Sequence, residues 1–291
     1  MERGINEYGQ RGNGAIIMTK GRLEKSVIVC LVSLSAVSAS STRAAASAID
    51  MNPRWDGGQA LRIVASSDSG QAEVLIPESS GVWIGEDWFY SLSRPLSIQS
   101  SEGLVLGRLE RLVLVVSGSP QVSLNFLVKA GASDTQFLIE SELLSFTTIA
   151  SATGRASAGI TVTDLDGDGV HLQGAFGDST RAYQSRINPG PGEMTFAELV
   201  ENVVLGPGGS ITSHGIFPSP VGVFSATSQA GLPLHSADSM QSAFEFTLSA
   251  NDVAGGTSVF ALTIPEPSVG VFAAFVGVSW LLLRRPERHR P

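Results

Sequence analysis

The chain has 291 residues, of which 43% are apolar and 16% charged, so it is long enough and apolar enough for a globular protein with a buried core. The formal net charge is −8, but residues 50–263 hold 22 acidic and 9 basic residues, a net −13 (9 − 22). This acidity argues against nucleic-acid binding, because a protein needs a positive surface to displace counterions from phosphates. The single cysteine, Cys30, lies near the N-terminus, which excludes a disulfide framework, cysteine-ligated zinc and a cysteine nucleophile from the middle of the chain.

Residues 1–48 combine a polar extension with the pattern of a signal peptide, and translation could start at Met1 or Met18. After Met18, three basic residues precede an apolar stretch of 12 residues. That stretch is shorter than the ~20 residues that span a bilayer. Small-x-small sites follow it at Ala39 and Ala48, and we expect cleavage after one of them. The alternative is an uncleaved N-terminal anchor.

Residues 49–263 alternate short apolar runs with clusters of Gly, Pro, Ser, Asn and Asp, which predicts an all-β extracellular domain. In the clearest strand, 121–129, every second side chain is apolar and points to one face. Turns at Asn251-Asp252 and Gly255-Gly256 are expected before the last strand. The other expected strands are 61–65, 72–76, 112–116, 137–143, 159–162, one around Phe244, Phe246 and Leu248, and 258–263. Seven or more strands over this length favour a β-sandwich or a jelly roll.

Two segments have a spacing that is compatible with a helix. The leucines of 104–116 suit the period of a helix or of a strand. The segment 194–203 predicts a short helix, because Thr195 and Glu198 form a capping-box pattern and Pro207-Gly208-Gly209 would end it.

Aromatic residues gather at 83–90, beside two carboxylates. If they were exposed, they would form a platform on which a sugar ring stacks. If they were buried, they would anchor the core of the sandwich, which is the more frequent role because each buries a large apolar area. The residues of this candidate platform are Trp83, Trp88 and Tyr90.

The sharpest local motif is Asp164-Leu-Asp166-Gly-Asp168-Gly169. Carboxylates at its first, third and fifth positions, followed by glycine, are how a tight loop presents oxygen ligands to Ca²⁺. The twelfth position is Ala175, where an EF-hand has a bidentate Glu, so the motif is no complete EF-hand. The alternative is a solvated turn between strands that end near Thr163 and start near Val170.

Catalytic motifs are scarce in the sequence. His171, His214 and His235 show no metal-binding spacing, and no nucleophile elbow, P-loop or dinucleotide-binding glycine motif occurs. Glu140 and Glu142 would share one strand face, like the paired carboxylates of a glycosidase, but such residues are usually solvated. We therefore expect no enzyme activity.

Residues 264–291 combine Pro265-Glu266-Pro267, an uncharged apolar run of 16 residues and a basic tail. As a helix the run is about 24 Å long, short of the ~30 Å hydrocarbon core, so the arginines must snorkel or the bilayer must thin. We expect a single transmembrane helix with its arginines on the cytoplasmic side. A buried core helix is the alternative, and it would have to end in a cluster of charge. The arginines are Arg284, Arg285, Arg288 and Arg290.

These residues resemble the PEP-CTERM sorting signal of exosortase-dependent bacteria, in which a motif, a short membrane helix and a basic tail follow one another in this order. The resemblance covers Ile264 to Pro291 and is accompanied by the signal peptide. It implies recognition of Pro265-Glu266-Pro267 by a membrane exosortase, removal of the tail, and delivery to the surface or the exopolysaccharide matrix. The ectodomains of such proteins share no chemistry, so the resemblance supplies no catalytic residue.

Together these patterns predict an exported, single-pass membrane-anchored protein whose ectodomain is released by processing to the cell surface or extracellular matrix. The expected role is non-catalytic, structural or adhesive, with exosortase, the membrane and exopolysaccharide as partners. One alternative is an extracellular carbohydrate-binding module with a structural calcium ion, and another is an extracellular glycan hydrolase. Burial of Trp83 and Trp88 distinguishes the first two functions, whereas a cleft with two carboxylates ~5–10 Å apart would favour the hydrolase.

Overall fold

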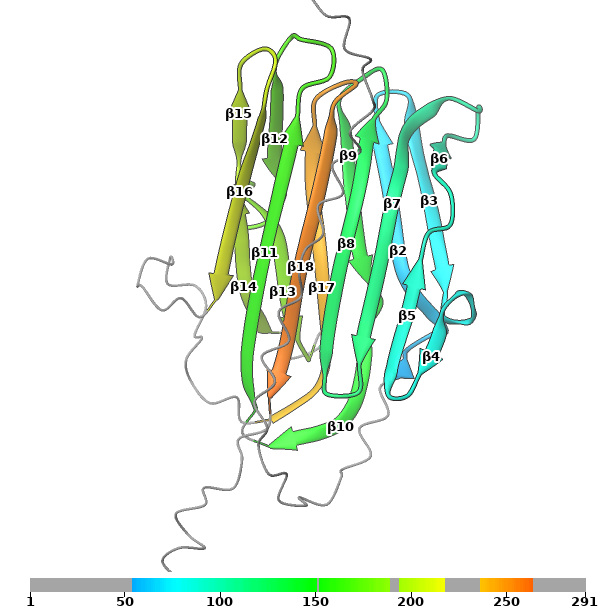
Figure 1. The fold of residues 1–291 in the computed structure, drawn as a ribbon, viewed down its shortest axis with the longest axis vertical. Coiled ribbons are helices and arrows are strands. Elements are labelled where there is room, and N and C mark those ends of the chain that lie inside the picture. Colours follow the sequence, from blue (N-terminus) through cyan, green and yellow to red (C-terminus); the bar gives the residue numbers. More distant parts are fainter. Residues whose placement is uncertain (1–53, 151, 189–193, 218–235, 264–291) are drawn as a thin grey trace, which may run out of the picture. The chain divides into compact units, whose positions relative to one another are not determined.

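The computed structural model describes residues 54–150, 152–188, 194–217 and 236–263 (Figure 1). All of them belong to the second of the two units into which the chain divides, Ser47–Pro291. The described residues form strands and one short 3-10 turn, which confirms the all-β class. The elements are β1 (Arg54–Trp55), β2 (Gln59–Ser67), β3 (Gly70–Pro77), η1 (Glu78–Ser80), β4 (Val82–Ile84), β5 (Asp87–Ser91), β6 (Leu96–Gln99), β7 (Val105–Ser117), β8 (Gln121–Ala130), β9 (Thr135–Ser141), β10 (Leu144–Ala150), β11 (Thr153–Thr163), β12 (Val170–Gly174), β13 (Arg181–Ile187), β14 (Met194–Glu201), β15 (Val203–Leu205), β16 (Ser210–Phe217), β17 (Ser236–Leu248) and β18 (Val253–Thr263).

The strands form two antiparallel sheets, one of ten strands and one of eight. In the larger sheet β17 is central: β9 and β10 pair along one of its edges, and β12 and β13 pair along the other. The smaller sheet runs in the order β16-β11-β18-β8-β7-β5-β4, with β6 beside β7. Each expected strand except 137–143 lies within an observed one, and most of the observed strands are longer than predicted; 137–143 runs two residues past the end of β9 at Ser141.

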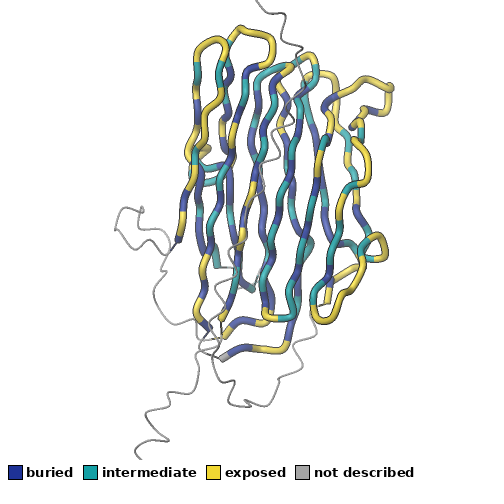
Figure 2. Tube along the Cα trace, in the orientation of Figure 1, coloured by how far each residue is buried: buried dark blue, intermediate teal, exposed yellow. Residues whose placement is uncertain are grey.

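The hydrophobic core lies between the two sheets. Along β8 the predicted inward residues are buried and the residues between them are partly exposed, and Figure 2 shows this alternation along the central strands. The ring of Phe126 in β8 lies 5.0 Å from that of Phe244 and 6.1 Å from that of Phe246, both in β17. Phe196 of β14 stacks on Phe260 of β18 at 5.2 Å. Because these contacts join one sheet to the other, the two sheets pack face to face as a β-sandwich.

The predicted helix at 194–203 is wrong, since this segment forms β14 and β15. Five of its residues are buried, Phe196, Ala197, Leu199, Val200 and Val203, and all of them except Ala197 follow the i, i+3, i+4, i+7 spacing of a helix. The spacing arises because β14 carries an extra residue at Phe196 against β13, and because Val200, at φ 69°, bends the chain. A bulge and a bend change which face of the strand is buried, and they thereby imitate a helical period.

The predicted turn at Gly255-Gly256 is also wrong, because both glycines lie inside β18. The hairpin between β17 and β18 turns at 249–252 instead, where Asn251 adopts a positive φ of 60°. Gly256 is needed for another reason: a Cβ atom there would lie 2.3 Å from the ring of Phe126. The glycine therefore makes room for the largest side chain of the neighbouring strand.

The two ends of the sandwich differ. Thr153 of β11 pairs with Thr263 of β18, and Thr163 pairs with Val253. The C-terminal residue of β18 therefore lies at the end where β11 begins, which we call the tail end (Figure 1). The opposite end, called the acidic end, carries the β11–β12 and β17–β18 loops. Within the described ranges no helix is long and apolar enough to cross a membrane.

Candidate functional site

The acidic end brings two loops together through the register of β11 and β18. Because Thr163 pairs with Val253, the next residues outward, Asp164 and Asp252, approach each other beyond the last pair. The β11–β12 loop confirms the predicted strand ends at Thr163 and Val170. Asp252 is fully buried, and its carboxylate accepts hydrogen bonds from the backbone N–H of Leu165 and the hydroxyl of Ser249. The loop is thus held by the neighbouring hairpin.

Asp164 is the organising carboxylate of the loop. Its oxygens accept backbone N–H groups of Gly208 at 2.6 Å, Gly167 at 2.8 Å, and Gly169 and Asp166 at 3.2 Å each. These donors, Gly208 first, lower the pKa of Asp164, because each bond favours the charged form. The carboxylate therefore stays ionised and fixes the β11–β12 loop to the β15–β16 loop.

Three carboxylates at this end have oxygen atoms that all lie within 4.8 Å of one another: Asp164, Asp166 and Asp252. The sequence predicted Asp168 as the third member and missed Asp252. Asp168 instead faces Asp166, and this contact raises the pKa of Asp168, first because protonated Asp168 hydrogen-bonds to Asp166 and then because two neighbouring carboxylates repel each other when both are charged. We call Asp164, Asp166 and Asp252 the acidic triad. Carboxylate oxygens at this separation could ligate one hard divalent cation such as Ca²⁺.

The aromatic cluster divides between the core and the surface. Trp88 is fully buried, packs edge-on against Trp55 at 5.6 Å, and donates its indole N–H to the carbonyl of Glu78. A buried indole cannot stack on a sugar, so Trp88 is corrected from a candidate stacking residue to a core residue. Tyr90 is partly buried, and burial raises its pKa. Trp83 is 41% exposed on β4 and could contact a ligand.

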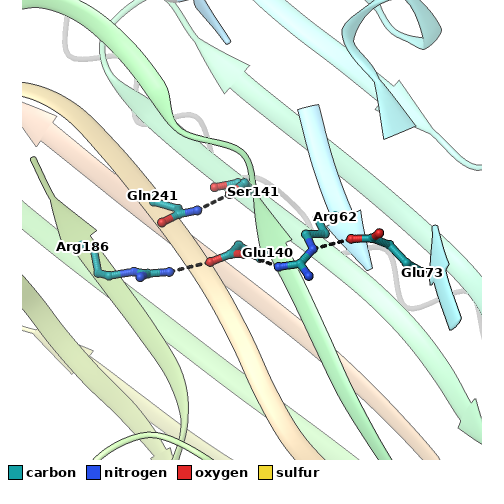
Figure 3. A network of polar contacts seen from close by, with 6 residues as sticks. All are labelled: Arg62, Glu73, Glu140, Ser141, Arg186 and Gln241. Atoms are coloured by element: carbon teal, nitrogen blue, oxygen red, sulfur yellow. Dashed lines mark hydrogen bonds and ion pairs between the residues drawn. The ribbon is translucent and has the colours of Figure 1, made fainter. Parts of the chain in front are cut away.

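Glu140 belongs to a chain of ion pairs across the larger sheet (Figure 3). Its carboxylate binds the guanidinium of Arg186 at 2.5 Å and lies 3.9 Å from that of Arg62, which in turn binds Glu73. On β17, Arg186 pairs with Gln241 and Glu140 pairs with Ala243, so the contact between them runs diagonally across this strand. Burial raises the pKa of Glu140, and the two arginines oppose this rise. This arrangement makes Glu140 a structural partner rather than half of a glycosidase pair.

One further titratable side chain lies between the sheets. Tyr183 of β13 is fully buried, and its hydroxyl accepts a hydrogen bond from Ser242 of β17 at 3.2 Å. Burial raises the pKa of Tyr183 to about 12, so the hydroxyl stays neutral. Ser242 in turn lies 3.5 Å from Ser258 of β18, which links the two sheets through hydroxyl groups.

The remaining predicted site residues are placed as follows. His171 lies in β12 and His214 in β16. His235, the sorting motif Pro265-Glu266-Pro267 and the arginines of the C-terminal tail lie outside the described residues.

Comparisons with known proteins supply little further information. No family model matches the chain, and no curated protein matches it. Among solved structures there is a likeness to a chain titled "Structure of infectious bursal disease virus Gt strain", at 13% identity. That match covers 80% of this chain and 72% of the other, with a TM-score of 0.18. A likeness at this level carries no argument about function.

Proposed function

We propose that this chain is an exported surface or exopolysaccharide-matrix protein with a structural or adhesive, non-catalytic role, and that an exosortase sorts it. The observation that carries the proposal is the order of parts at the C-terminus: Pro265-Glu266-Pro267 comes one residue after β18, and the apolar run and the arginines follow. A folded body, a cleavage motif, a short membrane helix and a stop signal in this order suit a protein that is held at the membrane and then released.

The β-sandwich supports this proposal through its geometry and its charge. The sorting signal starts from the tail end, so a membrane-held copy would direct its acidic end away from the bilayer. Residues 50–263 carry a net −13, and this charge favours the solubility of the body. Between the ends, long strands of the smaller sheet pair along nearly their full length, β11 with β18 and β7 with β8. Such a body suits a spacer that displays its far end.

Replacing Glu266 with glutamine tests the sorting part of the proposal. If exosortase recognises the motif, the variant should stay membrane-bound at its unprocessed mass, while the wild type is released without residues after the cleavage point. Cell fractionation followed by intact-mass measurement reports both states. Glu287→Gln, which makes the same change in the basic tail outside the motif, should be processed like the wild type. Exosortase sorting would be refuted if Glu266→Gln were processed like the wild type and if processing also continued in a strain that lacks the exosortase.

Calcium at the acidic end stays a prediction, which the acidic triad makes more specific. At fixed ionic strength, Ca²⁺ at ten to a hundred times its dissociation constant should stabilise the fold by about 1–3 kcal/mol, because it binds the folded state only. Asp166→Asn should abolish this gain, because it removes the charge of one of the three carboxylates of the acidic triad. Asp166 is the exposed member of the triad. Asp168→Asn makes the same charge change next to the triad and should keep the gain. Thermal unfolding with and without Ca²⁺ measures both variants.

The outcomes distinguish three arrangements. Loss of the gain in both Asp166→Asn and Asp168→Asn would move the ion to the trio predicted from sequence, Asp164, Asp166 and Asp168. Equal response of the wild type and both variants would show that the loop is only a turn.

A further inference from the structure

The edge strand β16 is open to another strand. Every residue from Ser210 to Phe217 pairs with β11 in continuous register, and β11 is the only described strand with which β16 pairs. In an antiparallel strand, alternate residues direct their N–H and C=O groups away from the neighbour. Along Ser210–Ile216 these groups form a row at the edge of the smaller sheet, where a further strand could bind.

Two other long edge strands, β3 and β14, carry features that obstruct such pairing, and the uncharged edge strands β4, β6 and β15 have only three or four residues each. The edge strand β3 ends in Pro77 and holds Glu73, which binds Arg62. The edge strand β14 has a bulge and carries Glu198 and Glu201. Charges, prolines and bulges are the usual means by which edge strands avoid pairing with another chain. β16 contains no charged residue, no proline and no bulge.

The sequence of β16, Ser-Ile-Thr-Ser-His-Gly-Ile-Phe, contains no Asp, Glu, Lys, Arg or Pro. It is rich in residues that favour strands, and Ile211 and Ile216 are each 38% exposed. Two copies of a body with net charge −13 repel each other, so they can approach most closely where the surface strand is uncharged. Among the described edge strands of eight residues, β3, β14 and β16, only β16 is uncharged, so the charge distribution favours it as the contact between copies.

We infer that β16 pairs edge to edge with β16 of a second copy of this chain, in antiparallel orientation about a two-fold axis. Such an interface uses the same patch on both copies, and it joins the two eight-stranded sheets into one. For the proposed structural role, this pairing makes a second copy of the chain the partner. The inference rests on the proposed function only in placing the paired copies in the matrix.

Antiparallel pairing has a consequence for polarity. A two-fold axis perpendicular to the strands reverses their direction, so the tail ends of the paired copies point in opposite directions. That orientation suits copies displayed on two facing surfaces. A single strand pair buries little area, so each contact is weak, and adhesion would depend on many contacts acting together.

The test places charge on the open edge. Thr212 and His214 are exposed on β16, on the same face as each other. Sedimentation velocity of the full chain in detergent should show concentration-dependent dimers for the wild type. Thr212→Glu with His214→Glu brings carboxylates of both copies together and should raise the dissociation constant at least about tenfold. The control, Thr257→Glu with Val259→Glu, adds the same charges to an interior strand of the same sheet and should dimerise like the wild type.

A mixing experiment separates this contact from association through the C-terminal apolar run and from misfolding. The variant Thr212→Lys with His214→Lys should be monomeric alone, but it should form heterodimers with the glutamate variant when the two are mixed. A wild type that stays monomeric, or a glutamate variant that dimerises like the wild type, would overturn the inference. Neither result bears on the processing of Glu266 variants, so the proposed sorting is tested separately.

A label at the tail end tests polarity. Ser119 lies in the β7–β8 turn at that end, and Cys30→Ser leaves Ser119→Cys as the only thiol. Spin labels at this position should be far apart in the antiparallel dimer. Short distances between them would show parallel pairing and refute the antiparallel arrangement.

Discussion

Replacing Phe126 with alanine should lower the free energy of unfolding by about 3–5 kcal/mol. The ring of Phe126 lies between the two sheets, within 5.0 Å of the ring of Phe244 and 6.1 Å of that of Phe246. Its removal leaves a cavity that strands held by pairing on both sides cannot close. Denaturant unfolding monitored by circular dichroism measures the change. Val259→Ala, on the exposed face of β18, should stay within about 0.5 kcal/mol of the wild type.

A substitution at Gly256 of the neighbouring strand also tests the packing of the Phe126 ring. Gly256→Ala places a methyl group 2.3 Å from the Phe126 ring and should cost about 1–3 kcal/mol through overpacking. In the Phe126→Ala background the added methyl group meets no ring, so its cost should largely disappear. A double-mutant cycle measures this coupling. Additive effects of the two substitutions would show that Gly256 and Phe126 do not compete for one space.

Replacing Glu140 with alanine should cost about 2–3 kcal/mol, less than the ~3–5 of a fully buried ion pair. The side chains of Glu140 and Arg186 are 14% and 21% exposed, so solvent screens the loss in part. The cost arises because the substitution deprives two guanidinium groups of a shared carboxylate. Glu73→Ala is the matched control: Glu73 binds the same Arg62, but its side chain is 45% exposed, and the expected cost is below about 1 kcal/mol.

The contribution of Glu140 to the free energy of unfolding should depend on pH in a definite direction. Burial raises the pKa of Glu140 above its ordinary value of 4.5, so ionisation is less favourable in the folded protein than in the unfolded chain. The wild type should therefore be most stable relative to Glu140→Gln below pH 4.5, and should lose this advantage as the pH rises through the raised pKa. Unfolding free energies of both proteins between pH 3 and 7 test it. An advantage that grows with pH would show that the arginines outweigh burial.

The sequence predicts most of the strands, because their side chains alternate in burial. It fails where a bulge shifts the alternation. In β7 the register slips by one residue against β6 at Leu106 and again against β8 between Leu109 and Arg111, so buried leucines at 106, 109 and 112 follow at steps of three. The helical interpretation of 104–116 and the wrong helix at 194–203 therefore have one physical cause. A bulge depends on the neighbouring strand, which local periodicity does not contain.

The candidate site was predicted only where its residues are adjacent in the sequence. Asp164 and Asp166 belong to one loop and were recognised from their spacing. Asp252 joins them because β18 pairs with β11, a contact between residues almost ninety positions apart. Glu140 was recognised as a carboxylate on a strand face, but its partners Arg62 and Arg186 come from two other strands. Pairing between strands that are distant in the sequence therefore determines which residues belong to the acidic triad and to the ion pairs of Glu140.

The interior position of β18 determines how the protein would respond to mechanical force. Every residue from Val253 to Thr263 pairs with β11, and Val253 to Ala261 also pair with β8. If the C-terminus is anchored as proposed, a pull on the body stretches the chain along the axis of this strand. The hydrogen bonds on both sides then bear the load together in shear, instead of breaking one after another as they would if the strand were peeled from an edge.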